Sequence, residues 1–349
     1  MCDSIKNKSD SVDISGQIEL RYTFGTIIGI CNVSSIILCF LIIYCFYIRF
    51  VEYKKSSYSA IAFFMVLTDL FYQIAIVTSL VPASFITNIK AFQEFETTYF
   101  VMISKNLHLL VIYFVNQIIL FMGIQRMSII YNKSNCLTSP IGSLIICTVF
   151  LLLDTVIIIL RRLTSFLRWI NYAGLFIDIC SSKEDYGVIH QIADSIFYIS
   201  FITPIIIFVL LLITYFRLKK DKNLIHIEER NEALALQNIN NRLANQNVAF
   251  PITTSKNMKN LLKKYKINSE RNFLFQQMIL CFTVSMGMLT TYIQFYSMIY
   301  ERIDNIYYGI FRGIFQQITF SSLSVCLVIF NKPIRDDIYE LLYKIFNCN

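Results

Sequence analysis

The stretch Tyr99–Tyr131, which reads YFVMISKNLHLLVIYFVNQIILFMGIQRMSIIY, decides the fold. A helix that crosses a bilayer needs about 20 mostly apolar residues at a rise of about 1.5 Å each, and this stretch is long enough. His108 and Arg126 stand near its two ends, about five helical turns apart, so both project from one face. We expect this face to contact protein, because charged side chains within membranes nearly always face the interior of a helix bundle. The alternative is that each side chain reaches to the nearest membrane surface.

Composition places the whole chain among the multi-pass membrane proteins. Its 349 residues are 56% apolar and 15% aromatic, and only 15% are charged. Soluble domains carry about 25% charged residues and lack repeated apolar runs of this length. We therefore predict an all-α membrane protein, a bundle of seven transmembrane helices followed by an amphipathic eighth helix. The seven candidate spans are residues 24–48, 58–81, 100–124, 141–160, 196–216, 273–296 and 309–330.

The basic residues predict an extracellular N-terminus. They gather in the short turn 49–57, the long loop 217–271 and the C-terminal tail, all of which would then face the cytoplasm. Three arginines after the fourth span oppose this orientation, but the short turn and the tail favour it. Residues 1–23 are then extracellular, 24–330 form the seven-helix domain, and 331–349 form the amphipathic helix and cytoplasmic tail. The net charge of +8 is expected to face membrane lipids and a protein partner, not nucleic acid.

Two acidic residues fall inside predicted spans. Asp69 lies about 21 Å beyond Lys55 by helical rise, deep in the bilayer, and Asp154 lies within the fourth span. An ionisable group at such depth is a candidate functional residue, and the alternative is that it only joins helices by hydrogen bonds. Pro82 is expected to end the second span, with a loop to follow, and Pro204 to kink the fifth helix.

The end of the chain predicts an amphipathic helix on the inner leaflet. Asn331 is placed to cap this helix, and Pro333 is tolerated in its first turn. Cys348, just beyond it, is a candidate lipidation site, and Asn7 in Asn7-Lys8-Ser9 is a candidate glycosylation site. The apolar stripe of the helix is Ile334, Ile338, Leu341, Leu342 and Ile345.

The predicted topology resembles that of G-protein-coupled receptors, and four stretches carry the resemblance. Leu67-Thr68-Asp69-Leu70 is similar to the family's second-helix aspartate motif, and Gln125-Arg126-Met127 stands where the family has an Asp-Arg-Tyr type triplet. Pro204 is similar to the fifth-helix proline, and Asn331-Lys332-Pro333-Ile334-Arg335 to the entry into the eighth helix. The spans rich in Phe, Ile and Tyr most resemble nematode serpentine chemoreceptors of the class V and class G branches.

The chain departs from the rhodopsin-like pattern in several places. Gln125 replaces the acid of the triplet, and the sixth span contains no proline. The seventh span ends in Ser324-Val325-Cys326-Leu327-Val328, where an Asn-Pro-x-x-Tyr motif is expected. The third span starts without the cysteine that usually forms a disulfide. These departures fit a divergent chemoreceptor branch and leave the activation switches open.

The resemblance implies a receptor that binds a small extracellular ligand and signals to a heterotrimeric G protein from the plasma membrane, by family analogy in a sensory cilium. It implies roles in activation and coupling for Asp69, Arg126, Glu270, Asn331 and Arg335. Glu270 stands just before the sixth span, so it is expected to pair with Arg126 at the inner ends of the third and sixth helices. The alternative is a solvated acid near the positive end of the sixth helix.

The predicted ligand-binding residues lie at the outer ends of the third and seventh helices: Lys105, His108, Arg312 and Gln316. Three of them are basic, which favours an anionic or hydrogen-bond-accepting ligand. The alternative is that Arg312 pairs with Glu301 or Asp304, or reaches to the membrane surface.

Other classes stay open. A ligand-gated channel of seven helices would have the opposite orientation, and a small-solute transporter would often show internal duplication and broken helices near the midplane. An enzyme is not expected, because the three histidines are scattered and neither a metal-ligand spacing nor a nucleophile motif occurs. We expect no cofactor and no metal.

Overall fold

The computed structural model describes residues 18–53, 57–130, 139–171, 175–180, 195, 202–217, 219, 272, 274–290 and 306–346. The chain divides into two units, Met1–Ile207 together with Leu280–Asn349, and Phe208–Ile279. The described residues are almost entirely helical and include one two-stranded antiparallel sheet.

Five helices of the first unit are long and apolar enough to cross a membrane. They are α2 (Ile18–Ile48), α4 (Ser57–Thr78) continued by α5 (Leu80–Phe85), α7 (Tyr99–Ile130), α8 (Pro140–Thr164) and α11 (Ile306–Phe330). Two further apolar helices, Ile202–Arg217 and Leu274–Thr290, are shorter. They overlap the predicted fifth and sixth spans, so a multi-pass membrane protein is supported and the count of seven spans stays a prediction.

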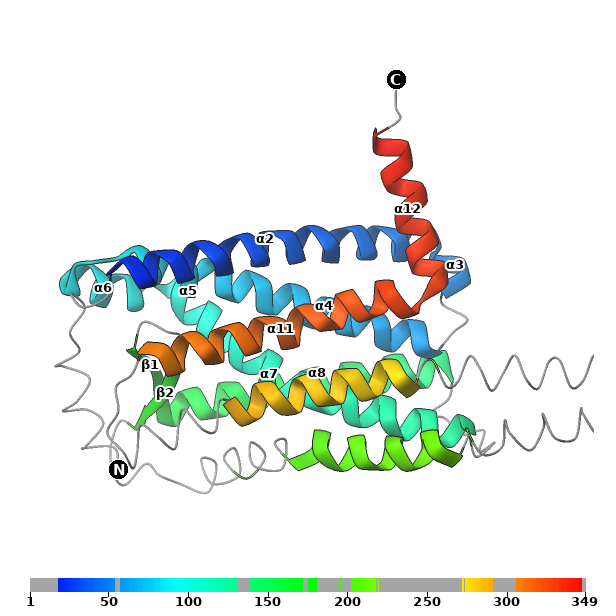
Figure 1. Cartoon of the computed structure of the whole chain (residues 1–349). Helices are drawn as coiled ribbons and strands as arrows, with labels where there is room; N and C mark the ends of the chain where they lie inside the picture. The colour runs from blue at the N-terminus through cyan, green and yellow to red at the C-terminus, as the bar shows by residue number, and fades with distance from the viewer. Residues whose placement is uncertain are drawn as a thin grey trace, which may run out of the picture. The chain divides into compact units, whose positions relative to one another are not determined.

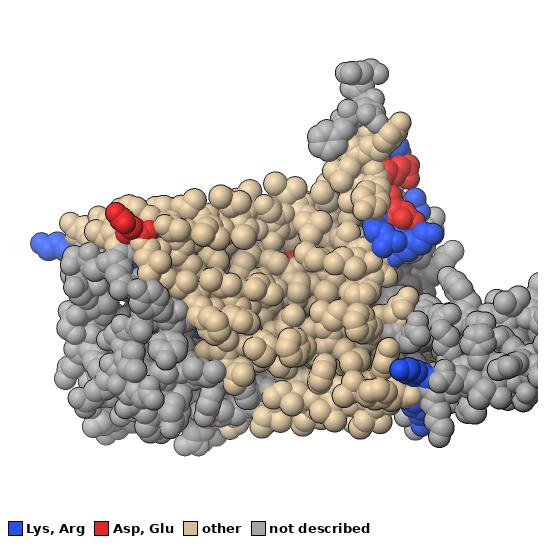
Figure 2. All heavy atoms as spheres, viewed as in Figure 1, with Lys and Arg blue, Asp and Glu red and all other residues tan. Residues whose placement is uncertain are grey.

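Helix α4 is the centre of the first unit, because it contacts α2, α7, α8 and α11 (Figure 1). In the most apolar 18-residue segment of α4–α5, and likewise in that of α7, 67% of the segment is buried inside the protein. The corresponding share is 22% in α2 and in α8. The exposed faces of α2 and α8 are apolar, as a helix face in contact with lipid must be. Figure 2 shows an almost uncharged band over α2, between charged side chains near α6 and near α12.

Small residues let these helices approach closely. A Cβ atom added to Gly313 of α11 would lie 2.6 Å from Cζ of Phe24 on α2. A Cβ atom on Gly25 would lie 2.6 Å from Cβ of Ser84. Small residues at such crossings are typical of helices packed within membranes, where close backbone contact supplies dispersion energy.

The prediction that Pro82 ends the second span is wrong. The helix breaks at Ser79 and resumes as α5, in which Pro82 is the third residue. A proline lacks the N–H of an interior helical residue, and its ring clashes with the carbonyl of the fourth residue before it. That residue is Thr78, the last of α4, so the proline moves the break upstream and does not end the helix at itself.

The predicted loop after Pro82 contains a further helix, α6 (Ile89–Glu96). The side chain of Asn88 caps this helix by accepting the backbone N–H of Lys90 at 2.8 Å. The predicted outer loop Arg161–Ser195 begins with the last residues of α8, followed by strands β1 (Ser165–Asn171) and β2 (Leu175–Cys180). They pair in antiparallel register from Ser165–Cys180 to Asn171–Leu175, so the fold is not strictly all-α.

Helix α2 begins at Ile18, within the predicted extracellular segment 1–23. In the first turn of the described helix, Nη2 of Arg21 donates hydrogen bonds to the carbonyls of Ala83 (3.1 Å) and Ile86 (2.7 Å). The guanidinium thereby satisfies carbonyl groups that a helix leaves without partners at its C-terminus, here that of α5. We call this end of the unit, where α5 and α6 lie, the α6 end.

The opposite end carries α3 (Phe50–Tyr53) and α12 (Lys332–Phe346), and we call it the α12 end. Asn331 Oδ1 accepts the backbone N–H of Ile334 at 3.4 Å, as predicted for a capping residue. Helix α12 turns away from the long helices (Figure 1). Ile334 and Ile338 are buried where α12 contacts α11 and α2, so this part of the predicted lipid-facing stripe packs on protein.

The second unit contains the helical residues 208–217 and 274–279. Most of the predicted loop 217–271 lies outside the described residues. The described part of the fifth helix begins at Ile202, two residues before Pro204. The kink predicted at Pro204 stays a prediction.

Candidate functional site

Buried polar side chains follow one face of α11. Arg312, Gln316, Gln317 and Ser324 are buried, whereas Phe311, Ile314, Ile318 and Val325 on other faces are exposed. A helix with this inside-out pattern turns its apolar faces to lipid and its polar face to the protein interior. The polar face contacts α2 and α4, and there it forms two groups of interacting residues.

The first group surrounds the buried carboxylate of Asp69 on α4. Oδ1 accepts a hydrogen bond from Nε2 of Gln73 at 2.7 Å. Oδ2 accepts one from Oγ of Ser324 at 2.5 Å and a longer one from Sγ of Cys39 at 3.4 Å. Helices α2, α4 and α11 therefore meet at this one carboxylate.

Further hydrogen bonds extend this group toward the α6 end. Gln317 Nε2 donates to Oε1 of Gln73 at 2.9 Å and to Oγ of Ser321 at 3.0 Å. Ser321 also contacts Oγ of Ser35 on α2 at 2.9 Å. We call the whole set the Asp69 network; its members are Ser35, Cys39, Asp69, Gln73, Gln317, Ser321 and Ser324.

The second group lies next to the network. The ring of Tyr72 stacks on Phe320, with centroids 3.9 Å apart, and its centroid is 5.3 Å from that of His108. The charge of Arg312 lies within electrostatic range of both Tyr72 and His108. We call Tyr72, His108, Arg312 and Gln316 the Arg312 cluster; all four are buried. The structure thus brings together His108 and Arg312, which the sequence placed on different helices.

Lys105 has an acidic partner within the protein, and its role in ligand binding stays a prediction. Its Nζ lies 2.8 Å from Oε1 of Glu96 on α6, and both side chains are largely buried. The acid balances the charge of Lys105. The alternative partners of Arg312, Glu301 and Asp304, lie outside the described residues.

His108 and Arg126 of α7 are both buried, which confirms that their common face contacts protein. At the α12 end, the guanidinium carbon of Arg126 lies 4.8 Å from the ring centroid of Tyr58 on α4, a cation–π contact. Gln125 Nε2 donates to Oγ of Ser143 on α8 at 2.9 Å. Glu270 lies outside the described residues, so its pairing with Arg126 stays a prediction.

Asn331 and Arg335 organise the corner between α11 and α12. Arg335 Nη1 donates to the backbone carbonyl of Ile329 at 3.0 Å, near the C-terminus of α11, while Asn331 caps α12. Asn7 and Cys348 lie outside the described residues, so the glycosylation and lipidation predictions stay predictions.

Sequence reasoning missed several members of both groups: Ser35, Cys39, Tyr72, Gln73, Gln317, Ser321 and Ser324. One signal was available, because Arg312, Gln316, Ser324 and their neighbours recur at helical spacing within an apolar run. The partners on α2 and α4 carried no such signal. Within the described ranges, no three His, Cys, Asp or Glu side chains group as a metal site would require.

The geometry therefore provides two adjoining buried polar groups, one containing a cation and one containing an acid, joined through adjacent residues of α4 and α11. Such groups are suited to binding a polar small molecule and to rearranging their hydrogen bonds when helices move. No model of a known protein family matches the chain, and no curated protein matches it either.

Proposed function

We propose that the protein is a chemosensory receptor of seven helices in the plasma membrane, which binds a small extracellular ligand and activates a heterotrimeric G protein. The observation that carries the proposal is the continuity of the Arg312 cluster with the Asp69 network. Tyr72 and Gln73 are neighbours on α4, and Gln316 and Gln317 are neighbours on α11, so each helix contributes to both groups.

The ligand class follows from the Arg312 cluster. Arg312 is a cation with a planar fork of donors, which suits a carboxylate or another anion with two acceptors. Tyr72, His108 and Gln316 add neutral polar edges and aromatic surface. We therefore propose a small organic acid with an apolar body as the ligand.

Signalling follows from the shared helices. A ligand that binds Arg312 more tightly in one arrangement of α11 shifts the population of arrangements toward that state. A displacement of α11 against α4 changes the hydrogen bonds of Gln317 with Gln73 and of Ser324 with Asp69, because each joins these two helices. At the α12 end, the contact of Arg126 with Tyr58 is then free to change, and the proposed G protein docks there.

The test is a G-protein dissociation reporter in cultured cells, with a panel of small carboxylic acids and their neutral methyl esters. We expect acids to activate and esters to fail. Arg312→Gln should reduce the potency of an active acid roughly 10- to 100-fold, as loss of one charged hydrogen bond of about 1.5–3 kcal/mol requires. Lys90→Gln, on the exposed surface of α6, is the matched control and should leave potency unchanged.

Asp69→Asn separates binding from signalling. It leaves the Arg312 cluster intact, so an active acid should still bind, while G-protein activation falls. Equal potency of acids and esters, or an unchanged potency in Arg312→Gln, would refute the ligand class. Absence of G-protein activation across the panel, in cells that display the protein on their surface, would refute the receptor.

A channel or transporter is the second candidate, and the buried acids Asp69 and Asp154 on different helices favour it. Buried acids in membranes also mark ion pathways. Ligand-dependent currents in cells without G proteins would identify this class. A C-terminal tag that labels on intact cells would reverse the predicted orientation and favour the channel.

A further inference from the structure

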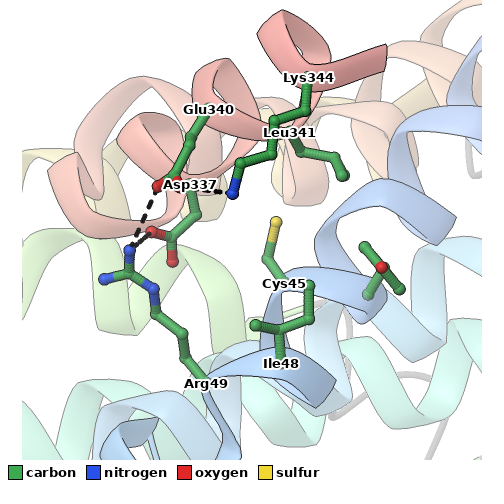
Figure 3. A pocket seen from close by; sticks show the side chains of 8 residues that line it. Cys45, Ile48, Arg49, Asp337, Glu340, Leu341 and Lys344 are labelled. Carbon is green, nitrogen blue, oxygen red and sulfur yellow. Dashed lines mark hydrogen bonds and ion pairs between the residues drawn. The ribbon is translucent and has the colours of Figure 1, made fainter. Parts of the chain in front are cut away.

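A groove lies between the last turn of α2 and the middle of α12 (Figure 3). Its volume is about 190 Å³. The residues of α12 that line it stand at helical spacing, so one face of this helix looks onto α2. The lining residues are Tyr44, Cys45, Ile48, Arg49, Asp337, Glu340, Leu341 and Lys344.

The charges of the groove alternate. Arg49 lies 2.8 Å from Asp337 and 3.7 Å from Glu340, and Glu340 lies 2.7 Å from Lys344. The two cations and two anions cancel formally. Asp337 is 7% exposed and anchors Arg49, whereas the side chains of Arg49, Glu340 and Lys344 are 41%, 54% and 66% exposed. The rim therefore offers both signs of charge to a bound molecule.

The exposed pair is charged at neutral pH. The hydrogen bond with Lys344 and the charge of that residue lower the pKa of Glu340, and the same pair raises the pKa of Lys344. A rim with fixed charges of both signs is complementary to a molecule that also carries both signs, and it disfavours a molecule with a single charge.

An apolar surface continues from the groove. Phe40, Tyr44 and Ile48 are exposed along α2, and Tyr339 and Tyr343 are exposed on α12. Tyrosines concentrate at the level of lipid head groups, where an apolar ring and a polar hydroxyl both find suitable surroundings. Because α2 is long and apolar enough to span a membrane, its last turn reaches this level. The groove therefore joins a charged rim to a lipid-facing surface.

We propose that the groove binds the head group of a phosphatidylethanolamine from the surrounding leaflet. The phosphate lies against Arg49 and Lys344, the ammonium lies against Glu340, and an acyl chain follows Tyr44 and Ile48 along α2. This inference needs only a membrane protein and does not rest on the receptor function.

The head-group chemistry distinguishes this lipid from the others of a bilayer. A primary ammonium donates three hydrogen bonds, as the lysine side chain does, and so can bond to Glu340. The trimethylammonium of phosphatidylcholine carries no N–H. Phosphatidylglycerol carries the same phosphate but a neutral glycerol in place of the ammonium, so the repulsion of its phosphate by Glu340 and Asp337 is not offset by a positive charge.

Native mass spectrometry of the detergent-purified full chain tests the proposal. The protein is incubated with phosphatidylethanolamine, phosphatidylcholine or phosphatidylglycerol of identical acyl chains, and the retained lipid is counted. We expect phosphatidylethanolamine to be retained most. Glu340→Gln and Lys344→Met should each lower its retention roughly fivefold, the factor that one hydrogen bond of about 1 kcal/mol supplies.

Matched controls keep the result interpretable. Glu94→Gln on α6 and Lys332→Met at the start of α12 remove the same charges from exposed positions outside the groove, and they should retain the lipid as the parent does. Since Glu340 and Lys344 are more than half exposed, their variants should unfold at the parent temperature, which a thermal scan verifies. Equal retention of the three lipids, strongest retention of phosphatidylglycerol, or parent-like retention by both groove variants would overturn the proposal.

A photoreactive phosphatidylethanolamine provides the position of binding. With the reactive group near the ammonium, labelled peptides should contain residues 44–49 or 337–344. Labels confined to other segments would also overturn the proposal.

Discussion

Gln117 of α7 donates a hydrogen bond from Nε2 to Oδ1 of Asp154 on α8, at 2.6 Å. Asp154 is fully buried, and neither its Oδ2 nor Oε1 of Gln117 has a hydrogen-bond partner in the described part of the chain. Two acceptors of one residue pair thus lack a donor. One proton on Asp154 would supply a donor and remove a charge that is costly within a membrane.

We therefore predict that Asp154 is protonated at neutral pH. Asp154→Asn keeps a neutral polar group of the same shape, so its resistance to thermal unfolding in detergent should stay close to that of the parent. Asp154→Leu leaves Gln117 without its partner and should lower stability by about 1–3 kcal/mol. Infrared spectroscopy should show the carbonyl band of a protonated carboxylic acid, and Asp154→Asn should remove it. An unchanged band, or an Asn variant as unstable as the Leu variant, would contradict the prediction.

From the Asp69 network we predict that removal of the Ser324 hydroxyl destabilises the protein. Ser324→Ala removes the shorter of the two hydrogen bonds to Oδ2 of Asp69 and leaves only the longer contact with Cys39. A buried acceptor deprived of a charged hydrogen bond costs about 1–3 kcal/mol, so the unfolding temperature should fall. Ser34→Ala is the control, since Ser34 is exposed and its hydroxyl only bonds within its own helix. Equal unfolding temperatures for the two variants would exclude a structural role for the Ser324–Asp69 contact.

We predict that alanine destabilises the protein at Gly313 and stabilises it at Gly29. Gly313→Ala would place a Cβ atom 2.6 Å from the ring of Phe24, so this buried ring or the two helices must shift, at a cost of about 1–3 kcal/mol. Gly29→Ala meets Val81 at 3.4 Å, an ordinary contact, and gains about 1 kcal/mol of helix propensity. Thermal unfolding compares the two variants. Phe24→Leu should relieve the damage of Gly313→Ala in the double variant, and a purely additive double variant would argue against the contact.

We predict that the stability of the α6 end depends on the forked arrangement of the hydrogen-bond donors of Arg21. Arg21→Met removes both hydrogen bonds to the carbonyls of Ala83 and Ile86 and should lower stability by about 2–4 kcal/mol. Arg21→Lys keeps the charge without the forked donors, so it should recover part of this loss. Lys90→Met, which removes an exposed cation at the same end, should have almost no effect. Hydrogen exchange at α5 offers a local readout, and unaltered protection in Arg21→Met would refute the capping role.

The Glu340–Lys344 pair predicts a pH response. Lys344 lowers the pKa of Glu340 in the folded state below its ordinary value of 4.5. The contribution of the pair to folding stability is therefore complete above pH 4.5 and is lost as the pH falls through the lowered pKa. A carboxyl-detected NMR titration should give a midpoint below 4.5 for Glu340 and a return toward 4.5 in Lys344→Met. Asp336→Asn, an exposed neighbour outside the groove, should leave the midpoint unchanged. A Lys344→Met midpoint identical to that of the parent would show that the pair does not form.

The sequence by itself determined the class of the protein and the position of its long helices. Apolar runs of span length are a property of consecutive residues, so the predicted span 100–124 lies within α7 and the predicted span 309–330 matches α11 within a few residues. The cap at Asn331 is equally local, because a capping side chain bonds a backbone group three residues on. The break at Ser79 and helix α6 were missed, although Pro82 and Asn88 carried local signals for them.

Only the tertiary structure decided which polar side chains meet. Gln317 and Gln73 are 244 residues apart in the chain, and Ser35 and Ser321 are 286 apart, so no spacing rule connects them. Nor does hydropathy tell a lipid-facing side of a membrane helix from a protein-facing one, because both surroundings accept apolar residues. For that reason the sequence singled out α7, whereas in the structure α4 contacts the four other long helices, α2, α7, α8 and α11. Glu96 becomes the partner of Lys105 because α6 packs on α7. Tyr58 becomes the partner of Arg126 because α4 packs on α7.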